Sequence, residues 1–143
     1  MISKTGLHAI KALAALAGLA DGAYAGAADV AQSIGAPRNY LGKLLKALAN
    51  AGLVESQKGK GGGFRLARAP SLIPLLDVLE PIEPIARWSG CFLGGSQCSD
   101  GSPCCLHDRW KTVRDVYLQF LSETTIADLL GRIPAASGNP TGH

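Results

Sequence analysis

Aromatic and charged residues are scarce in this chain of 143 residues. Aromatics make up 6% of the sequence and charged residues 17%, whereas apolar residues reach 47%. No apolar run approaches the roughly 20 residues that a membrane-spanning helix needs, so we expect no membrane segment. The high apolar content excludes an intrinsically disordered chain. We therefore expect a globular protein of about one domain, in which many Ala and Gly residues let the elements pack closely.

Motifs of the common enzyme classes are also lacking. No phosphate-binding P-loop, no Ser/His/Asp set and no paired carboxylates stand out. A thiol oxidoreductase would need a C-x-x-C dithiol near a βαβ pattern, and neither is present. We therefore predict that the chain is not an enzyme.

The N-terminus resembles a secretory signal only superficially. Lys4 precedes a stretch rich in Ala and Leu, as in a signal peptide. Lys11, however, interrupts the apolar run, and residues 12–20 are typical of a helix built from small residues. We therefore expect a cytoplasmic protein, in which structural disulfides are rare.

Basic charge is concentrated in the N-terminal half. Residues 1–68 contain nine Lys or Arg against three Asp or Glu, whereas residues 69–143 contain five against eight. A basic half joined to an acidic half indicates that one end contacts a polyanion. Solvated surface charge is the alternative, and charge alone does not separate the two.

The spacing of apolar residues predicts a helix–turn–helix. Residues 5–20 and 28–34 have helical patterns, and Gly35 stops the second helix. Pro37 suits the first position of a third helix, and Gly52 is placed to cap its end. The third helix has an apolar stripe on one side, made of Leu41, Leu44, Leu45 and Leu48. Its opposite side is polar and basic, with Asn39, Lys43, Lys46 and Asn50.

Two short strands, 53–56 and 64–66, are predicted next, with a basic, Gly-rich hairpin tip between them. Two strands after a helix–turn–helix form a wing. The predicted fold class is therefore mainly α: a winged helix-turn-helix over residues 1–69 with a two-stranded wing, plus a long C-terminal dimerisation helix.

This arrangement predicts binding to double-stranded DNA. The second helix of a helix–turn–helix enters the major groove, where Arg and Lys donate to guanine and Asn pairs with adenine. Wing residues contact phosphates and give affinity without sequence information. The predicted DNA contacts are Arg38, Asn39, Tyr40, Lys43, Lys58, Lys60, Gly61 and Arg65. Tyr40 either packs inward or contacts the DNA backbone. A helical bundle with solvated lysines is the alternative, which the basic Gly-rich hairpin disfavours.

The C-terminal half is predicted to contain four segments. Residues 70–90 form a helix (72–80, with Pro74 in its first turn) and a Pro-punctuated connector, and residues 91–107 form a cysteine-rich loop. Residues 108–131 form dimerisation helices, and residues 132–143 a disordered tail. The long helix, which begins near Leu106, has a coiled-coil-like seam of Leu106, Trp110, Val113, Tyr117, Phe120 and Leu121. Thr125 and Asp128 match a capping box that opens a short helix ending at Leu130.

All four cysteines lie within 15 residues, at Cys91, Cys98, Cys104 and Cys105. Clustered thiols in a reducing compartment favour metal or redox chemistry. Zinc ligands usually lie two to four residues apart, so gaps of six and five fit a larger centre better, such as an iron–sulfur cluster. The predicted ligands are Cys91, Cys98, Cys104 and His107, with Cys105 as a spare thiol. The alternatives are four free thiols, and a His107 that caps the following helix.

Four stretches, "ISKTGLHAIKAL", "PRNYLGKLLKALANAGLVES", "GKGGGFRLAR" and "CCLHDRW…FLSETTIADLL", closely resemble the Rrf-type winged-helix transcriptional regulators, the family of IscR, NsrR, RirA and CymR. The resemblance covers about residues 2–131, and its specific parts are the glycine-rich wing and the cysteine loop. It implies a homodimer joined by the long helix, bound to a palindromic operator.

The resemblance also implies how a cluster would be held. Cluster-binding members use three loop cysteines, matched here by Cys91, Cys98 and Cys104, plus a variable fourth ligand. IscR-like members use a histidine, which His107 matches. NsrR-like members use an acidic residue from the first helix of the partner subunit, where this chain has Leu7. The resemblance therefore slightly favours a [2Fe–2S] over a [4Fe–4S] cluster.

We therefore predict a transcriptional regulator that senses redox, nitric oxide or iron status through this cluster. Since the loop lies between the DNA-binding domain and the dimer helix, the cluster would fix the angle between the two recognition helices. Members without cysteines regulate by other means, so a cluster-free thiol regulator is the alternative. An iron–sulfur carrier that does not bind DNA is a more remote one.

Overall fold

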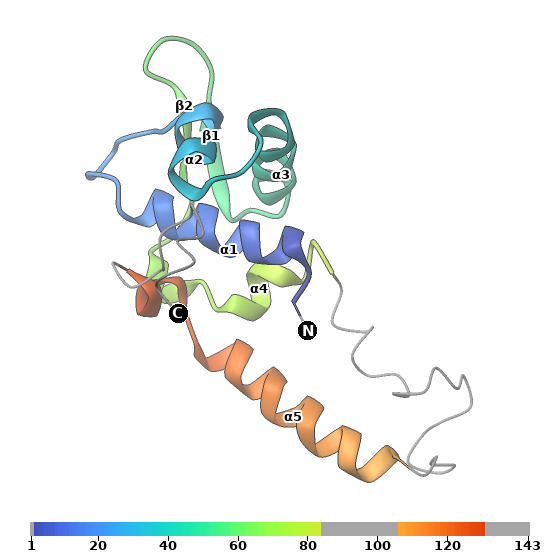
Figure 1. The fold of residues 1–143 in the computed structure, drawn as a ribbon. Helices are drawn as coiled ribbons and strands as arrows, with labels where there is room; N and C mark the ends of the chain where they lie inside the picture. The colour runs from blue at the N-terminus through green and yellow to red at the C-terminus, as the bar shows by residue number, and fades with distance from the viewer. Residues whose placement is uncertain (1, 84–105, 131–143) are drawn as a thin grey trace, which may run out of the picture.

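The computed structural model describes residues 2–83 and 106–130. Helix α1 (Lys4–Ala17) begins after Ser3, whose hydroxyl oxygen accepts a hydrogen bond from the amide of Gly6. Helix α2 (Ala27–Ile34) ends at Gly35, which has a left-handed backbone with φ of +72°. Helix α3 (Arg38–Asn50) follows a short turn. These three helices confirm the predicted helix–turn–helix, and Figure 1 shows α2 and α3 on the same side of α1.

Both ends of α3 differ slightly from the sequence-based expectation. Pro37 has an extended backbone (ψ of 137°) and caps the helix instead of forming its first turn. At the other end, Ala51 is the capping residue and Gly52 follows it with φ of +82°. Each end of α3 therefore lies one residue away from the position expected. Helix ends commonly differ by this much between two ways of assigning them.

The wing is a two-stranded antiparallel hairpin. Strand β1 (Val54–Gln57) pairs with β2 (Gly63–Leu66), so that Val54 lies opposite Leu66. Each predicted strand is displaced or extended by one residue. A further bridge, which the sequence did not predict, joins Phe64 to Ala25 in the loop before α2, with N···O distances of 2.9 and 2.8 Å. The wing is therefore anchored through β2 to the loop that precedes α2.

Helix α1 occupies the centre of the core. It packs against α2 and α3 on one side and against the C-terminal elements on the other side. The predicted leucine stripe of α3 is confirmed, since Leu41, Leu45 and Leu48 are completely buried. At roughly 2 kcal/mol for each buried leucine, this stripe is a major stabilising contribution.

The C-terminal elements are η1 (Pro70–Leu72), α4 (Leu75–Leu79), α5 (His107–Glu123) and η3 (Ile126–Leu129). A continuous helix over 72–80 was expected and is wrong: Pro74 has an extended backbone and caps α4, so the chain breaks there. Proline lacks an amide hydrogen and favours this position before a helix. The capping box of Thr125 and Asp128 is confirmed, although it opens a 3-10 turn.

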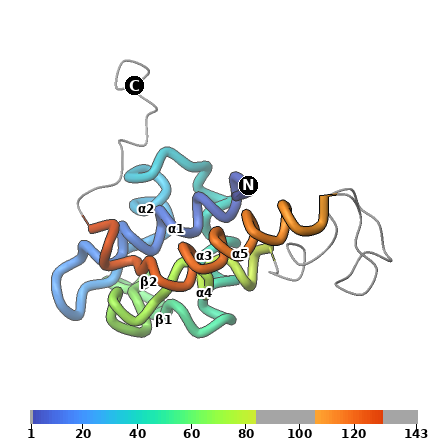
Figure 2. The backbone as a smooth tube through the Cα atoms, turned by 90° about the horizontal axis from the view of Figure 1, so that it is seen from below, coloured from blue at the N-terminus to red at the C-terminus, as the bar shows by residue number. Residues whose placement is uncertain are grey.

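Two backbone hydrogen bonds attach the end of α5 to the rest of the protein. The amide of Leu75 donates to Thr124 O at 2.8 Å, and the amide of Ile126 donates to Ile73 O at 3.0 Å. Leu121 and Ile126 complete this junction as fully buried side chains. The C-terminal end of α5 is therefore fixed, whereas its N-terminal half projects beyond the other helices (Figure 2).

The predicted apolar seam of α5 is divided between two faces. Leu121 is buried and Trp110 and Tyr117 are half-buried, whereas Val113 and Phe120 are about half exposed, at 52% and 50%. Val116, which the seam did not include, is 62% exposed and extends this outer stripe. Within the described ranges no helix has the length and hydropathy needed to cross a bilayer. The connector beyond residue 83, the cysteines and the tail lie outside those ranges.

Candidate nucleic-acid interface and cysteine segment

The N-terminal end of α3 presents polar side chains to solvent. Arg38, Asn39 and Lys43 are all exposed, and the first turn of the helix contains no acidic residue. The amide groups and the positive end of the helix dipole therefore remain available to a phosphate. Arginine, lysine and asparagine donors at this end of a helix suit the edges of bases in a major groove.

Tyr40, predicted as a DNA contact, instead packs inward against α1. Its hydroxyl lies 3.0 Å from Nδ1 of His8, and the two rings meet edge to face with their centroids 5.4 Å apart. Of the two positions left open by the sequence, the structure shows the inward one. Burial, followed by the charges of Lys11 and Lys4, lowers the pKa of His8 below its ordinary value of 6.5, so the imidazole is neutral near pH 7.

The wing tip is exposed and basic. Lys58, Lys60 and Gly61 are all exposed, and the turn closes with a hydrogen bond from the amide of Gly62 to Gly59 O at 3.0 Å. Gly59 and Gly61 have φ of +91° and +76°, a backbone conformation that glycine adopts without strain. Lysines on such a hairpin can reach phosphates or the minor groove.

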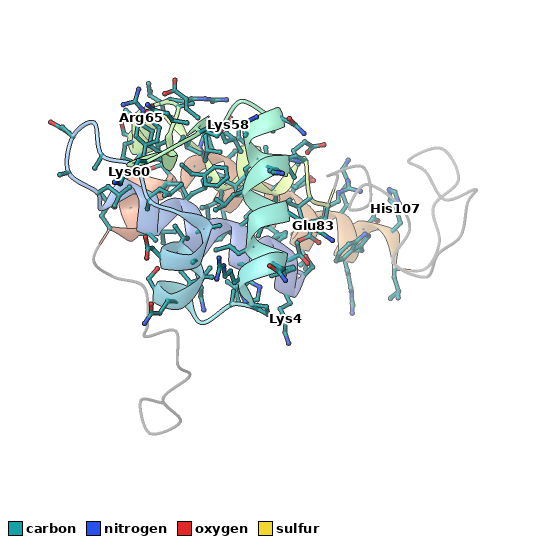
Figure 3. All side chains as sticks on the ribbon, turned by 90° about the horizontal axis from the view of Figure 1, so that it is seen from above. Lys4, Lys58, Lys60, Arg65, Glu83 and His107 are labelled. Atoms are coloured by element: carbon teal, nitrogen blue, oxygen red, sulfur yellow. The ribbon has the colours of Figure 1, made fainter. Side chains whose placement is uncertain are left out.

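Arg65 lies in strand β2, opposite Glu55, and has two protein partners. Its Nε donates to Glu55 Oε1 at 2.9 Å, and its guanidinium carbon lies 4.7 Å from the centre of the Tyr24 ring. An exposed ion pair of this kind contributes little stability, but the two contacts together orient the side chain. Figure 3 shows Lys58, Lys60 and Arg65 on one side of the molecule. Arg65, which the sequence predicts to contact DNA, therefore also has a structural role, because it binds Glu55 and Tyr24.

The predicted cluster ligands fall mostly outside the described residues. Cys91, Cys98 and Cys104 all lie beyond them, and His107 is the first residue of α5. Figure 3 shows His107 far from the labelled wing residues. Among residues 2–83 and 106–130, no group of three possible metal ligands lies together. The structure therefore does not test the ligand set. The predicted ligands are thiolates and an imidazole, and both are known ligands of iron–sulfur clusters.

Glu83, which the sequence reasoning missed, is buried at the end of the first described range. It is only 6% exposed, and its Oε1 accepts hydrogen bonds from the amide and the hydroxyl of Ser3, each at 3.0 Å. Burial, and secondly the charge of Glu83, raise the pKa of Tyr117 on α5. The sequence feature that could have pointed to Glu83 is its position as an acidic residue between Ile82 and Pro84, in an otherwise apolar connector.

Gly6 shows how closely Glu83 packs against α1. A Cβ atom at this glycine would lie 2.5 Å from Glu83 Oε1 and 2.8 Å from Leu79 Cδ2. Only a residue without a side chain allows this approach. The chain is therefore held against the first turn of α1 at Glu83, eight residues before Cys91.

Comparison with known proteins identifies relatives over most of the chain. The model of the Rrf2 family, described as "Iron-dependent Transcriptional regulator", matches residues 2–132. A provisionally named HTH-type transcriptional regulator of Mycobacterium tuberculosis (strain ATCC 25618 / H37Rv) is 35% identical over 125 residues, 87% of this chain and 77% of the relative. The regulator IscR of Vibrio atlanticus (strain LGP32) is 31% identical over 103 residues, 72% of this chain and 59% of the relative.

Solved structures share the fold. CymR, described as the global cysteine regulator of B. subtilis, matches with a TM-score of 0.79 and 25% identity, covering 94% of this chain and 98% of CymR. IscR of T. potens matches with a TM-score of 0.73 and 27% identity, covering 90% of this chain and 85% of that one. Both likenesses extend over the winged helix and the C-terminal elements.

Proposed function

Because this chain belongs to the Rrf2 family of transcriptional regulators, we propose that it acts in the cytoplasm as a homodimer on a palindromic DNA operator. The observation that carries this proposal is the exposed polar end of α3 beside a basic, glycine-rich wing. A dimer places two such helices about 34–36 Å apart, one turn of DNA, so that both enter the major groove.

The outer stripe of α5, defined as Val113, Val116 and Phe120, supports the homodimer. Three neighbouring apolar side chains that are each at least half exposed are unfavourable in water and typical of an interaction surface. In a symmetric dimer the same stripe meets its own copy. The expected stabilisation is about 1 kcal/mol for each side chain that becomes buried, counted on both subunits.

We also propose that the cysteine segment holds an iron–sulfur cluster and that the regulator senses redox, nitric oxide or iron status through it. Cys91, Cys98 and Cys104 with His107 would be the ligands, with [2Fe–2S] slightly favoured. The cluster would supply a centre that oxidants or nitric oxide modify and that is lost when iron is scarce. Of the described residues that flank this segment, Glu83 is bound to Ser3, and His107 is the first residue of α5.

Salt-dependent DNA binding tests the first part of the proposal. A duplex would be selected from a randomised pool with the wild-type protein, and its affinity measured over a range of salt concentrations. Lys58→Ala and Lys60→Ala should each weaken binding to all sequences and lower the slope of log K against log[salt] by about 1. Lys111→Ala, on α5, is the control and should keep the wild-type slope. Unchanged slopes in both wing variants would refute the assignment.

Iron and sulfide analysis tests the second part. Protein purified without oxygen should be coloured and should contain both elements. Cys98→Ala should remove the absorbance, whereas Cys105→Ala, its matched control, should keep most of it. If Cys105→Ala is the more damaging change, Cys105 is a ligand in place of Cys104.

A cluster-free thiol regulator is the second candidate, favoured by the likeness to CymR, whose solved relatives include an oxidised form. This candidate predicts a colourless protein without iron, whose operator affinity changes when thiols are oxidised and recovers with a reductant. A coloured, iron-containing protein with no salt-dependent DNA binding would instead indicate an iron–sulfur carrier.

A further inference from the structure

A small pocket lies where the end of α1 meets the end of strand β2. Its volume is about 160 Å³. The last turn of α1 with the loop that follows it, strand β2, and the chain just after β2 form its walls. Leu16 and Leu66 provide apolar surface, and Leu16 is only 3% exposed. At about 30 Å³ for each water molecule, the pocket can hold about five waters, or one organic molecule of similar size.

Two arginines in the pocket lining, Arg65 and Arg68, supply positive charge. Each has one carboxylate partner, and neither partner belongs to the lining. Nε of Arg65 lies 2.9 Å from Glu55 Oε1, and Nη1 of Arg68 lies 3.5 Å from Asp77 Oδ2. Both arginine side chains are still 39% exposed. Because a guanidinium group has five N–H donors, each arginine keeps donors for a second carboxylate.

The end of α1 supplies negative charge to the same pocket. The last turn of this helix contains no basic residue, so no side chain of that turn offsets the partial negative charge of its terminal carbonyl groups. Asp21, in the loop that follows, is exposed and also lines the pocket. A helix end and a carboxylate together favour a cation such as an ammonium group. The pocket therefore combines a positive and a negative part within the space of one small molecule.

We propose that this pocket binds a small α-amino acid in its zwitterionic form. The carboxylate would bind Arg65 and Arg68, whose donors match both carboxylate oxygens, and the ammonium group would lie beside Asp21 and the end of α1. A plain anion such as phosphate would be repelled by Asp21 and the helix end, and a metal cation by the two arginines. The volume of the pocket excludes long side chains and suits glycine, alanine or serine.

Arg65 connects the pocket with the wing. The carboxylate of a bound amino acid competes with Glu55 for this arginine and changes its position over the Tyr24 ring, whose centre lies 4.7 Å from the guanidinium carbon. Tyr24 directly precedes Ala25, which is bridged to Phe64 in β2. The expected signature of an occupied pocket is therefore a change at Arg65 Nε and at the Tyr24 ring, together with the loop residues 19–23.

Titration of the full-length protein, followed by its NMR signals, tests the ligand class. Glycine, L-alanine and L-serine are added in turn, and at least one should shift the Arg65 Nε–H signal and the amides of residues 19–23 with a Kd of about 1 mM or tighter, which a ligand of this size can reach. Propionate lacks the ammonium group and ethylamine lacks the carboxylate, so each should bind at least about tenfold more weakly. The absence of shifts with all three amino acids would overturn the proposal. Propionate that binds as tightly as L-alanine would also overturn it, because the site would then recognise an anion alone.

Substitutions in the lining test the placement of the ligand. Arg68→Ala removes a partner of the carboxylate and should weaken binding about tenfold, and Asp21→Asn removes a charge beside the ammonium group and should weaken it at least about threefold. Arg109→Ala, at an exposed arginine on α5, is the control and should keep the wild-type affinity. Melting curves verify folding, and Arg68→Lys replaces Arg68→Ala if that variant unfolds. Wild-type affinity in both lining variants would place the ligand elsewhere and overturn the proposal. Since these measurements use the protein without DNA, their outcome is separate from that of the operator experiment.

Discussion

Replacing Gly63 by alanine should destabilise the wing much more than the same change at Gly61 in its tip. Gly63 has φ of +135°, and a Cβ atom there would collide with the Ala25 carbonyl oxygen and lie 2.6 Å from Ala25 C and 2.9 Å from Gly26 N. These are backbone atoms, which cannot move aside as a flexible side chain would. The two hydrogen bonds between Ala25 and Phe64 hold them in place.

The expected loss of stability in Gly63→Ala has two parts, which are backbone strain at residue 63 and the loss of hydrogen bonds between Ala25 and Phe64. The positive φ costs alanine about 1–2 kcal/mol, and losing two backbone hydrogen bonds costs about 1 kcal/mol each. The sum, about 3 kcal/mol, is a large part of the 5–15 kcal/mol typical of a whole domain. At roughly 3 °C per kcal/mol for a chain of this size, the melting temperature should fall by about 9 °C.

Gly61→Ala is the matched control. Gly61 also has a positive φ, +76°, but a Cβ atom there would meet nothing within 4 Å. Any effect of the substitution on the unfolded chain is the same at both sites, so the difference between the variants reports the collision together with the more unusual φ of Gly63. Thermal unfolding followed by circular dichroism, with hydrogen exchange of the Phe64 amide as a local probe, measures both variants. Melting temperatures within about 2 °C of each other, with Phe64 equally protected, would refute the reasoning.

Two further predictions concern the dimer and pH. Phe120→Glu places a charge in the outer stripe of α5 on both subunits, so dimer dissociation measured by sedimentation should increase about a hundredfold. Ser122→Glu, an exposed position off the stripe, should leave the dimer intact, and equal effects would contradict the assignment. The lowered pKa of His8 means that the unfolded chain takes up this proton more readily. Its contribution to stability is therefore full above about pH 6.5 and is lost as the pH falls below that. Urea titrations should show a smaller acid-induced loss in His8→Asn than in wild type, and identical pH profiles would contradict this.

The winged helix could be predicted from the sequence because its signals are local. The leucine spacing of α3, the glycine after α2 and the basic Gly-rich tip each specify a structure within a few residues. The predictions failed where a local signal was ambiguous. Pro74 is compatible with the first turn of a helix or with its cap, and the contacts of 73–75 with 124–126 settle it as a cap.

The apolar pattern of α5 was ambiguous for a different reason. A heptad-like spacing indicates that a helix has an apolar face, but it does not indicate how many partners that face meets. In the structure, Leu121 and Tyr117 face the rest of the chain and Val113, Val116 and Phe120 do not. A single stripe in the sequence therefore serves two surfaces on α5.

For the candidate site, the sequence predicted which residue types are present, but it did not predict the contacts that those residues make. Exposed Arg38, Asn39 and Lys43 follow from the helical face on which they lie. The inward position of Tyr40 and the partners of Arg65 depend on His8 and Tyr24, which are distant in sequence. Glu83 could not be recognised either, since its role arises from Ser3, 80 positions away. Long-range polar contacts have no periodicity that a sequence pattern can show.

The alanine-rich composition of α1 gains a physical explanation from these contacts. Small residues let the helix approach its neighbours closely, and Ala9 and Ala12 are entirely buried there. Larger side chains at these positions would overpack the core and push α1 away from α3 or from α4. Either displacement would separate His8 from Tyr40 or Ser3 from Glu83. The same small residues that pack the core therefore also keep α3 and the C-terminal elements in close contact with α1.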